Sequence, residues 1–209
     1  MSGMSPRKSV VEAAATRTRI IERALTLGSV DGLEGLTIGH LATDLGMSKA
    51  GVIGHFGTKE ALQLAVVDEA VERFRLRVPG HALGARPGIE RLTRAFEEWI
   101  DYMTGDEEHR GCFLTSVAME YDERPGPIRD AILTALSRWS DYVTAELNEA
   151  VKAGELPHNT DVPQLTFELG GIALAVQQAI LLTRDPTAAT RGRQAIHRLL
   201  DHTNTHGGD

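Results

Sequence analysis

Residues 37–62 read TIGHLATDLGMSKAGVIGHFGTKEAL and predict two short helices joined by a tight turn. In residues 38–45 the apolar positions recur at spacings of three and four, Gly46 suits a left-handed turn, and Ser48 is a good N-cap for a second helix. These lengths are typical of a helix-turn-helix, although the same pattern also fits a plain turn in a helical bundle. The second helix begins with residues small enough to press into a DNA major groove: Lys49, Ala50 and Gly51.

The sequence LATDLGMSKAGVIGHFGTKEAL resembles the DNA-binding signature of the TetR family of transcriptional repressors. That signature runs Leu-Ala, then Ala-Gly-Val-Ser, then Tyr-x-His-Phe, then Ser/Thr-Lys-Glu, and the resemblance covers about residues 16–62. The family usually carries an aromatic residue at the position of Ile53, and often at Gly54, to contact the DNA backbone. Without those hydroxyl groups, DNA contact would rest more on Lys49, His55 and Lys59.

Each residue of the expected DNA surface has a physical role. Thr37 should cap the first helix of the motif and Ser48 the second, leaving amides that can hold a phosphate. Lys49 could reach a base edge or a phosphate, and Lys59 would lie beside the DNA backbone. The expected DNA-binding residues are Thr37, Ser48, Lys49, Ala50, Gly51, Ile53, His55 and Lys59.

The whole chain is expected to be all-α, because apolar residues recur at helical spacing and no long stretch alternates with period two. Residues 1–14 read as a flexible arm, 15–62 as the helix-turn-helix domain, and 88–203 as a helical ligand-binding and dimerisation domain. A long helix should link the two domains as far as residue 78, before a loop rich in proline and glycine at 79–88. Further helices are expected at 88–104, 111–122, 126–153, 162–183 and 187–203, followed by a disordered tail at 204–209.

Charge is distributed unevenly over the 209 residues. Residues 1–60 carry 7 Lys/Arg and 6 Asp/Glu, whereas the remainder carries 15 and 23, which argues against a chain that binds polyanions over its whole surface. A single cysteine excludes an intrachain disulfide, and the first ten residues lack the apolar core of a secretory signal. The longest apolar stretch is too short to span a bilayer, so a cytoplasmic location is expected.

Residues 165–182 are apolar nearly all round, which predicts a helix buried on several sides. Gly170 and Gly171 lie in its middle, where each costs about 1 kcal/mol relative to alanine unless a close helix contact offsets the cost. In the TetR family the last two helices form a four-helix bundle with a second copy, so a homodimer is expected, although the same residues could pack within one chain. The expected interface is Leu169, Gly170, Gly171, Ala173, Val176, Ile180, Ile196, Leu199 and Leu200.

Two aromatic pairs, Trp99 with Tyr102 and Trp139 with Tyr142, each share one helix face. Such a set could line an apolar pocket with indole and hydroxyl donors, although aromatic residues at this spacing also build ordinary cores. The expected effector is a largely apolar molecule with one or two polar groups. The expected pocket residues are Phe96, Trp99, Tyr102, Met103, Cys112, Phe113, Met119, Trp139 and Tyr142.

The sequence offers little for catalysis. Cys112 and His109 lack a further partner, the acidic turn at 106–109 reads as a solvated loop, and His197, His202 and His206 do not have metal-ligand spacing. Neither a Walker motif nor a dinucleotide-binding glycine pattern occurs, so no cofactor, metal or enzymatic activity is expected. The leading hypothesis is a homodimeric repressor that binds a palindromic operator and is released by a small molecule. The alternative is an all-helical ligand-binding protein or enzyme whose N-terminal part is structural.

Overall fold

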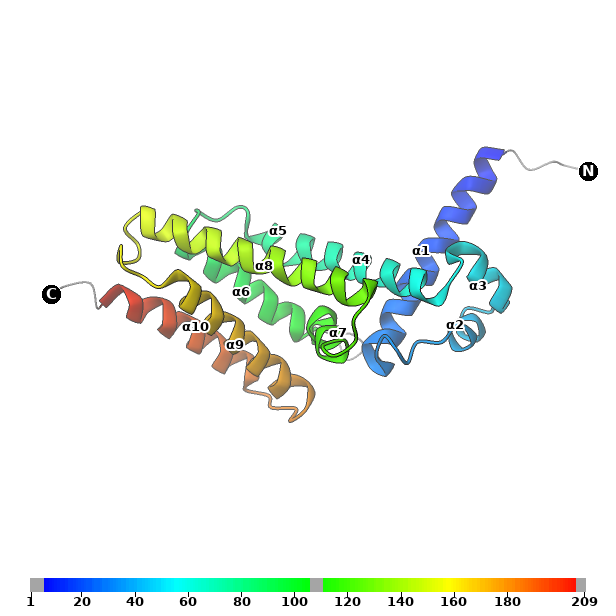
Figure 1. The fold of residues 1–209 in the computed structure, drawn as a ribbon. Coiled ribbons are helices and arrows are strands. Elements are labelled where there is room, and N and C mark those ends of the chain that lie inside the picture. The colour runs from blue at the N-terminus through cyan, green and yellow to red at the C-terminus, as the bar shows by residue number, and fades with distance from the viewer. Residues whose placement is uncertain (1–5, 106–110, 206–209) are drawn as a thin grey trace, which may run out of the picture. The chain divides into compact units, whose positions relative to one another are not determined.

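The computed structural model describes residues 6–105 and 111–205, and these residues form ten helices without any strand, which confirms the all-α expectation (Figure 1). None of the helices among these residues is long and apolar enough to cross a membrane. The helices are α1 Pro6–Asp31, α2 Ile38–Asp44, α3 Lys49–Phe56, α4 Lys59–Arg77, α5 Pro79–Ala82, α6 Ile89–Met103, α7 Phe113–Glu120, α8 Pro127–Lys152, α9 Val162–Leu181 and α10 Ala188–Thr205.

Both ends of the chain are more helical than expected. α1 begins at Pro6, so residues 6–14 belong to a helix rather than to a flexible arm. Proline is well tolerated in a first turn, and the Glu-Ala-Ala-Ala run at 12–15 favours helix, although residues 10–15 are exposed. At the other end, α10 continues through Thr205 into the expected tail. The expected flexibility of residues 1–5 and 206–209 lies outside the described residues.

The chain divides into two compact units, and the division differs from the expected boundary at 79–88. The head unit comprises residues 1–71 together with 116–132, and the C-terminal unit comprises 72–115 together with 133–209. The boundary therefore falls inside α4, and the expected loop contains the short helix α5. Three helices, α4, α7 and α8, contribute residues to both units.

The core of the head unit is built from aliphatic side chains of α1, the loop after it, and the helix-turn-helix. Leu41 and Val52 are fully buried where α2 and α3 pack against each other, and Ala42 is almost completely buried, as its small side chain allows. Leu45 and Met47 are only partly buried. Arg23 of α1 forms a two-bonded ion pair with Asp44 at the end of α2, with one N–O distance of 2.7 Å, which ties α1 to the motif.

A segment far along the chain completes the head unit. The carboxylate of Glu120 accepts hydrogen bonds from the amides of Leu33 and Glu34, at 2.9 and 2.7 Å. The buried amide of Gln63 donates to the carbonyl oxygen of Leu33 at 2.8 Å and to the hydroxyl of Tyr121 at 3.3 Å. Residues 116–132 therefore satisfy polar groups of the loop between α1 and α2.

The C-terminal unit is organised around α6, α9 and α10, which pack against one another (Figure 1). α10 approaches closely at Gly192, where an added Cβ would lie 2.4 Å from a methyl group of Val176 and 3.3 Å from one of Ile100. Only glycine allows this approach without displacing a neighbour. Gly170 and Gly171, where a close helix contact is expected, face open space within the described part of this single chain.

Candidate functional site

The helix-turn-helix has the local geometry that the sequence predicts. The hydroxyl of Thr37 accepts from the amide of His40 at 3.1 Å and caps α2, and the hydroxyl of Ser48 accepts from the amide of Gly51 at 3.0 Å and caps α3. Gly46 adopts a φ of +64°, a left-handed conformation that glycine accepts without strain. Caps and turn together hold a helix of 8 residues that is too short to be stable alone.

The outer face of α3 is flat and exposed. Ser48, Lys49, Ala50, Ile53 and Gly54 are all exposed, whereas Val52 on the opposite face is fully buried. An added Cβ at Gly54 would meet nothing within 4 Å, so α3 presents backbone and small side chains to its surroundings. A helix with such a surface can approach a nucleic-acid groove closely.

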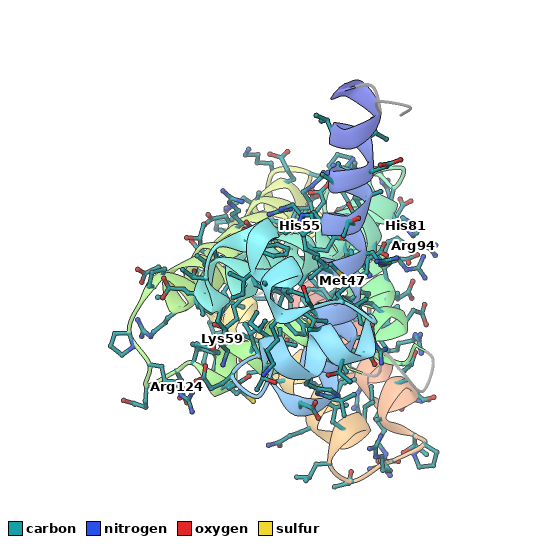
Figure 2. All side chains as sticks on the ribbon, turned by 90° about the vertical axis from the view of Figure 1, so that its right-hand side faces the viewer. Met47, His55, Lys59, His81, Arg94 and Arg124 are labelled. Atoms are coloured by element: carbon teal, nitrogen blue, oxygen red, sulfur yellow. The ribbon has the colours of Figure 1, made fainter. Side chains whose placement is uncertain are left out.

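Contacts with neighbouring residues restrict the polar side chains of α3. The side chain of Lys49 lies across Gly39 of α2, with its Cε 3.0 Å from where a Cβ of Gly39 would be. His55 lies partly buried beside Phe56, with ring centroids 6.4 Å apart, and the guanidinium of Arg17 lies 4.9 Å from the Phe56 ring centroid. Figure 2 views this end of the chain, with Met47 in the turn and His55 near the end of α3 both labelled.

Lys59 is less available to DNA than the sequence suggests. Its ammonium group donates to the carbonyl oxygen of Glu34 at 2.7 Å and lies 3.8 Å from the Glu34 carboxylate. The charge of Lys59, followed by a hydrogen bond from Tyr121, holds the pKa of Glu34 below its usual value. Because Lys59 follows the cap Thr58 at the start of α4, its side chain reaches the loop before α2 and ties it down.

The four aromatic residues that the sequence pairs on two helices come together in the C-terminal unit. The indole rings of Trp99 and Trp139 are 5.1 Å apart, and Trp139 stacks on Tyr142 at 5.4 Å. Phe74 of α4 lies with its ring nearly perpendicular to those of Trp99, Tyr102 and Trp139, at 5.7, 6.1 and 5.3 Å. With Phe96, which contacts both indoles, these six residues form what we call the aromatic cluster: Phe74, Phe96, Trp99, Tyr102, Trp139 and Tyr142.

Sequence reasoning missed Phe74, whose ring contacts three of the other five members of the cluster. A signal for it exists, because Val67, Ala70 and Phe74 recur at helical spacing and are all buried along α4. Met119 was included in the pocket but does not belong there, because it is 52% exposed and lies in the head unit. Met103, Cys112 and Phe113 are buried in the C-terminal unit.

Cys112 has a structural partner. Its amide donates to the side-chain oxygen of Gln177 at 2.6 Å, and the side-chain nitrogen of Gln177 donates to the Cys112 carbonyl at 3.1 Å. This pair of bonds fixes the start of α7 against α9 and satisfies a buried amide side chain. Its possible partner His109 and the acidic turn at 106–109 lie outside the described residues. Among the residues that are described, no group of three His, Cys, Asp or Glu could hold a metal ion.

Two polar atoms of the aromatic cluster have no partner in the described chain. These are the indole nitrogen of Trp99 and the hydroxyl oxygen of Tyr142, both shielded from solvent. Burial raises the pKa of Tyr102 to about 12 and that of Tyr142 to about 12, and the Glu146 carboxylate adds to the effect on Tyr142. Both phenols are therefore neutral hydrogen-bond donors at physiological pH.

Most of the expected interface residues lie in the core of the C-terminal unit. Six of the nine are buried within the chain: Leu169, Ala173, Val176, Ile180, Ile196 and Leu200. A second copy cannot contact side chains already used in this way. The exposed face of α9 consists instead of residues spaced by three or four: Phe167, Gly171, Leu174, Gln178 and Leu182. Of the residues expected at the interface, only Gly171 lies on this face.

Comparison with known proteins places both parts of the chain in one family. The sequence model described as bacterial regulatory proteins, tetR family, matches residues 20–66. The model described as the C-terminal domain of tetracyclin repressor-like proteins matches residues 88–196, about half of the chain.

Individual relatives agree over nearly the whole length. The HTH-type transcriptional regulator SrpR of Pseudomonas putida is 27% identical over 183 residues, which is 87% of this chain and 83% of that protein. A transcriptional regulator from Saccharomonospora viridis, solved with choline, has a TM-score of 0.78 at 22% identity, covering 90% of this chain and 97% of that one. AibR, solved with isovaleryl coenzyme A and operator DNA, has a TM-score of 0.71 at 20% identity, covering 90% and 98%.

Proposed function

Because this chain belongs to the TetR family of bacterial transcription regulators, we propose that it is a homodimeric repressor that binds a palindromic operator and is released by a small molecule. The observation that carries the proposal is the exposed face of α3, a capped helix of small residues held by the turn at Gly46. In this proposal two copies of α3 enter successive major grooves, about 34–36 Å apart. The protein acts by occupying DNA and has no catalytic role.

The proposed DNA contacts fall into two groups. Lys49, Ala50 and Ile53 are exposed on α3 and are proposed to meet DNA, with Ser48 presenting the first amides of the helix. Lys59 is proposed to act indirectly, since its hydrogen bond to Glu34 holds the loop before α2. Ile53 and Gly54 replace the aromatic contacts usual in the family, so close approach of the helix has to compensate for missing hydroxyl donors.

A charge placed on α3 tests this proposal. Ala50→Glu puts a carboxylate on an exposed position, where it should leave the fold intact but repel the phosphates lining a groove. We expect affinity for a duplex from the protein's own upstream region to fall at least tenfold, about 1.4 kcal/mol, by fluorescence anisotropy. Ala145→Glu, the same change at an exposed position of α8, is the control and should bind like the unmodified protein. Equal affinity for both variants would contradict a role of α3 in binding.

The dimer is proposed to form through the exposed face of α9. Phe167 is 75% exposed, Leu174 44% and Leu182 76%, which is costly for an isolated chain and is normal where a partner covers them. Gly170 and Gly171 destabilise the helix and leave open space beside it. A partner helix approaching that space would offset the cost.

Two leucines of similar exposure give a matched test of the interface. Leu174→Glu lies on the proposed face, whereas Leu136→Glu lies on α8, where the leucine is 41% exposed. We expect Leu174→Glu to shift the protein from dimer to monomer in light scattering and to weaken operator binding, because one copy reads only one half-site. Leu136→Glu should remain dimeric. A dimeric Leu174→Glu variant would exclude this face.

The aromatic cluster is the proposed effector site. Its support is continuity along α4, because residues 59–71 of this helix belong to the head unit while Phe74 belongs to the cluster. An effector can shift the protein between DNA-binding and released states only if its affinity differs between them. Coupling of typical size, 1–3 kcal/mol, would lower operator affinity by roughly 5- to 150-fold. An effector bound with no change in operator affinity would contradict the release mechanism.

A further inference from the structure

The two unpartnered donors of the aromatic cluster call for a hydrogen-bond acceptor. Trp99 is 8% exposed, and neither its indole N–H nor the Tyr142 hydroxyl has a partner in the described chain. A buried polar group left unpaired costs about 1–3 kcal/mol, and folded proteins keep few of them. Both residues contact the ring of Trp139, so the two donors belong to the same aromatic cluster.

The aromatic cluster extends from the core of the C-terminal unit to partly exposed positions. Tyr102, Trp139 and Tyr142 are only partly buried, whereas Phe96 and Trp99 lie beneath them in the core. The cluster is built from aromatic rings that contact one another mostly edge to face, so a ligand beside it would contact mainly aromatic carbon. An apolar body is therefore favoured, with polar atoms only where the donors are.

The charges beside Tyr142 argue against an anionic group at that hydroxyl, whereas at Tyr102 the neighbouring charge is that of Arg73, which acts to lower the pKa of Tyr102. Glu146 is buried next to Tyr142, where its carboxylate accepts from the amide of Gly88 at 2.9 Å and lies 3.4 Å from the guanidinium of Arg91. Arg91 is in turn bound to the carbonyl oxygen of Ala85, so its charge is already used. A ligand carboxylate at Tyr142 would face the negative charge of Glu146.

A cationic ligand fits no better. An ammonium group offers no acceptor, so the Trp99 N–H, which can only donate, would stay unpaired. The ring faces of Trp139 and Tyr142 are partly covered by each other, since the two rings stack at an interplanar angle of 23°. Glu98 of α6, the other buried carboxylate among the described residues, is paired with Arg94 at 2.7 Å and lies 3.3 Å from His81.

We propose that the aromatic cluster binds a neutral, largely apolar molecule that carries hydrogen-bond acceptors for the Trp99 N–H and the Tyr142 hydroxyl. The inference rests on the proposed function, in which the C-terminal unit binds the effector, and it names the class of that effector. A carbonyl oxygen flanked by an aromatic or aliphatic group has the required chemistry, because it has two lone pairs and no charge.

Four probes of similar size separate the ligand classes. Acetophenone carries a neutral acceptor, ethylbenzene carries none, benzoate is an anion and phenyltrimethylammonium is a cation. We expect acetophenone to bind the full-length protein at least tenfold more tightly than each of the others, measured by ligand-observed NMR titration. If another probe binds as tightly as acetophenone, or if none of the four binds, the proposed class is wrong.

Conservative variants test the two donors. Trp99→Phe and Tyr142→Phe keep a ring but remove the donor, and thermal unfolding checks that each is folded. Each should reduce the preference for acetophenone over ethylbenzene to about threefold or less while leaving ethylbenzene affinity within about twofold. Trp139→Phe is the control, because it removes ring surface without removing an unpartnered donor, so the preference should survive while both affinities fall. An unchanged preference in the donor variants would overturn the assignment.

The same samples separate this inference from the proposed function. Operator affinity is measured by anisotropy with and without saturating acetophenone. Failure of the probe series together with normal operator binding would remove only the ligand class. Tight, donor-dependent binding of acetophenone by a protein that does not bind operator DNA would support the class and contradict the repressor.

Discussion

The head unit and the C-terminal unit differ in how completely their buried polar side chains are hydrogen-bonded. In the head, Gln63 and Tyr121 bond to each other, and Glu120 receives two backbone amides. In the C-terminal unit, Trp99 and Tyr142 keep buried donors without a partner in the described chain. These polar groups of the head unit are bonded within the unit, whereas two buried donors of the C-terminal unit have no partner among the described residues.

This difference matches what each unit is proposed to do. A surface that reads DNA works best when its helices are held in one geometry, and bonds from Glu120 and Lys59 hold the loop before α2. A site that responds to a ligand needs unmet interactions that the ligand can supply. Variants that remove a hydrogen-bonding side chain from the head unit, or an unpartnered donor from the C-terminal unit, test this difference.

The largest effect on stability is expected when the carboxylate of Glu120 is removed from the head unit. Glu120→Ala leaves the amides of Leu33 and Glu34 without their acceptor, and we expect the free energy of unfolding to fall by about 2 kcal/mol in urea denaturation. Glu120→Gln keeps one acceptor oxygen and should lose about half as much. Glu123→Ala, an exposed glutamate nearby, should change stability by less than about 0.5 kcal/mol. A loss equal to that of Glu123→Ala would mean that the contact stabilises nothing.

The next largest effect on stability is expected from removing the hydroxyl of Tyr121, with Tyr142 as the matched comparison. Tyr121→Phe removes a hydroxyl that donates to Glu34 and accepts from Gln63, and should cost about 1 kcal/mol. Tyr142→Phe removes a hydroxyl without such bonds, and should change stability by less than about 0.5 kcal/mol or raise it slightly. Thermal unfolding of the two variants side by side measures the difference. Equal losses would show that the Tyr142 hydroxyl has a partner in solution.

The smallest effect concerns alkaline pH. All three tyrosines of the chain have a raised pKa: burial raises that of Tyr102 and of Tyr142 to about 12, and burial together with Glu34 raises that of Tyr121. The folded state therefore holds these protons more tightly than the unfolded state. Their contribution to stability is complete below pH 10 and is lost as pH rises from 10 through 12.

Spectroscopic titration of tyrosinate checks this prediction. The folded protein should show little tyrosinate at a pH where the urea-unfolded protein is half ionised. Tyr142→Phe should remove one of the late-titrating groups and leave the signal of Tyr121 in place. Tyrosines that ionise in the folded protein at the ordinary pKa would contradict their burial.

The sequence was most informative where interactions are local. The caps at Thr37 and Ser48 join atoms three residues apart, and Gly46 makes its turn alone, so short patterns predict all three. The ends of α8 and α9 lie within two residues of their expected positions, because proline and glycine interrupt helices by their own backbone properties.

Prediction failed where partners are distant. The bonds from Glu120 to the loop before α2 span 86 and 87 residues, and no periodicity encodes them. The two aromatic pairs were recognisable because each shares a helix face, but the part that Phe74 plays depends on tertiary packing. For α9, which is apolar nearly all round, the pattern cannot distinguish the buried residue Leu169 from the exposed Phe167.

The head unit is built from two separate stretches of the chain, residues 1–71 and 116–132, and this affects when it can finish folding during translation. On the ribosome, the loop at residues 32–34 emerges long before Glu120, and at roughly 5–20 residues per second the wait lasts from about 4 to 17 seconds. During that time the nascent helix-turn-helix lacks its carboxylate acceptor. The helix-turn-helix therefore gains this acceptor only after residues 72–115 of the C-terminal unit have been synthesised. A truncated product of interrupted translation, ending before residue 116, would carry α3 on an unfinished head.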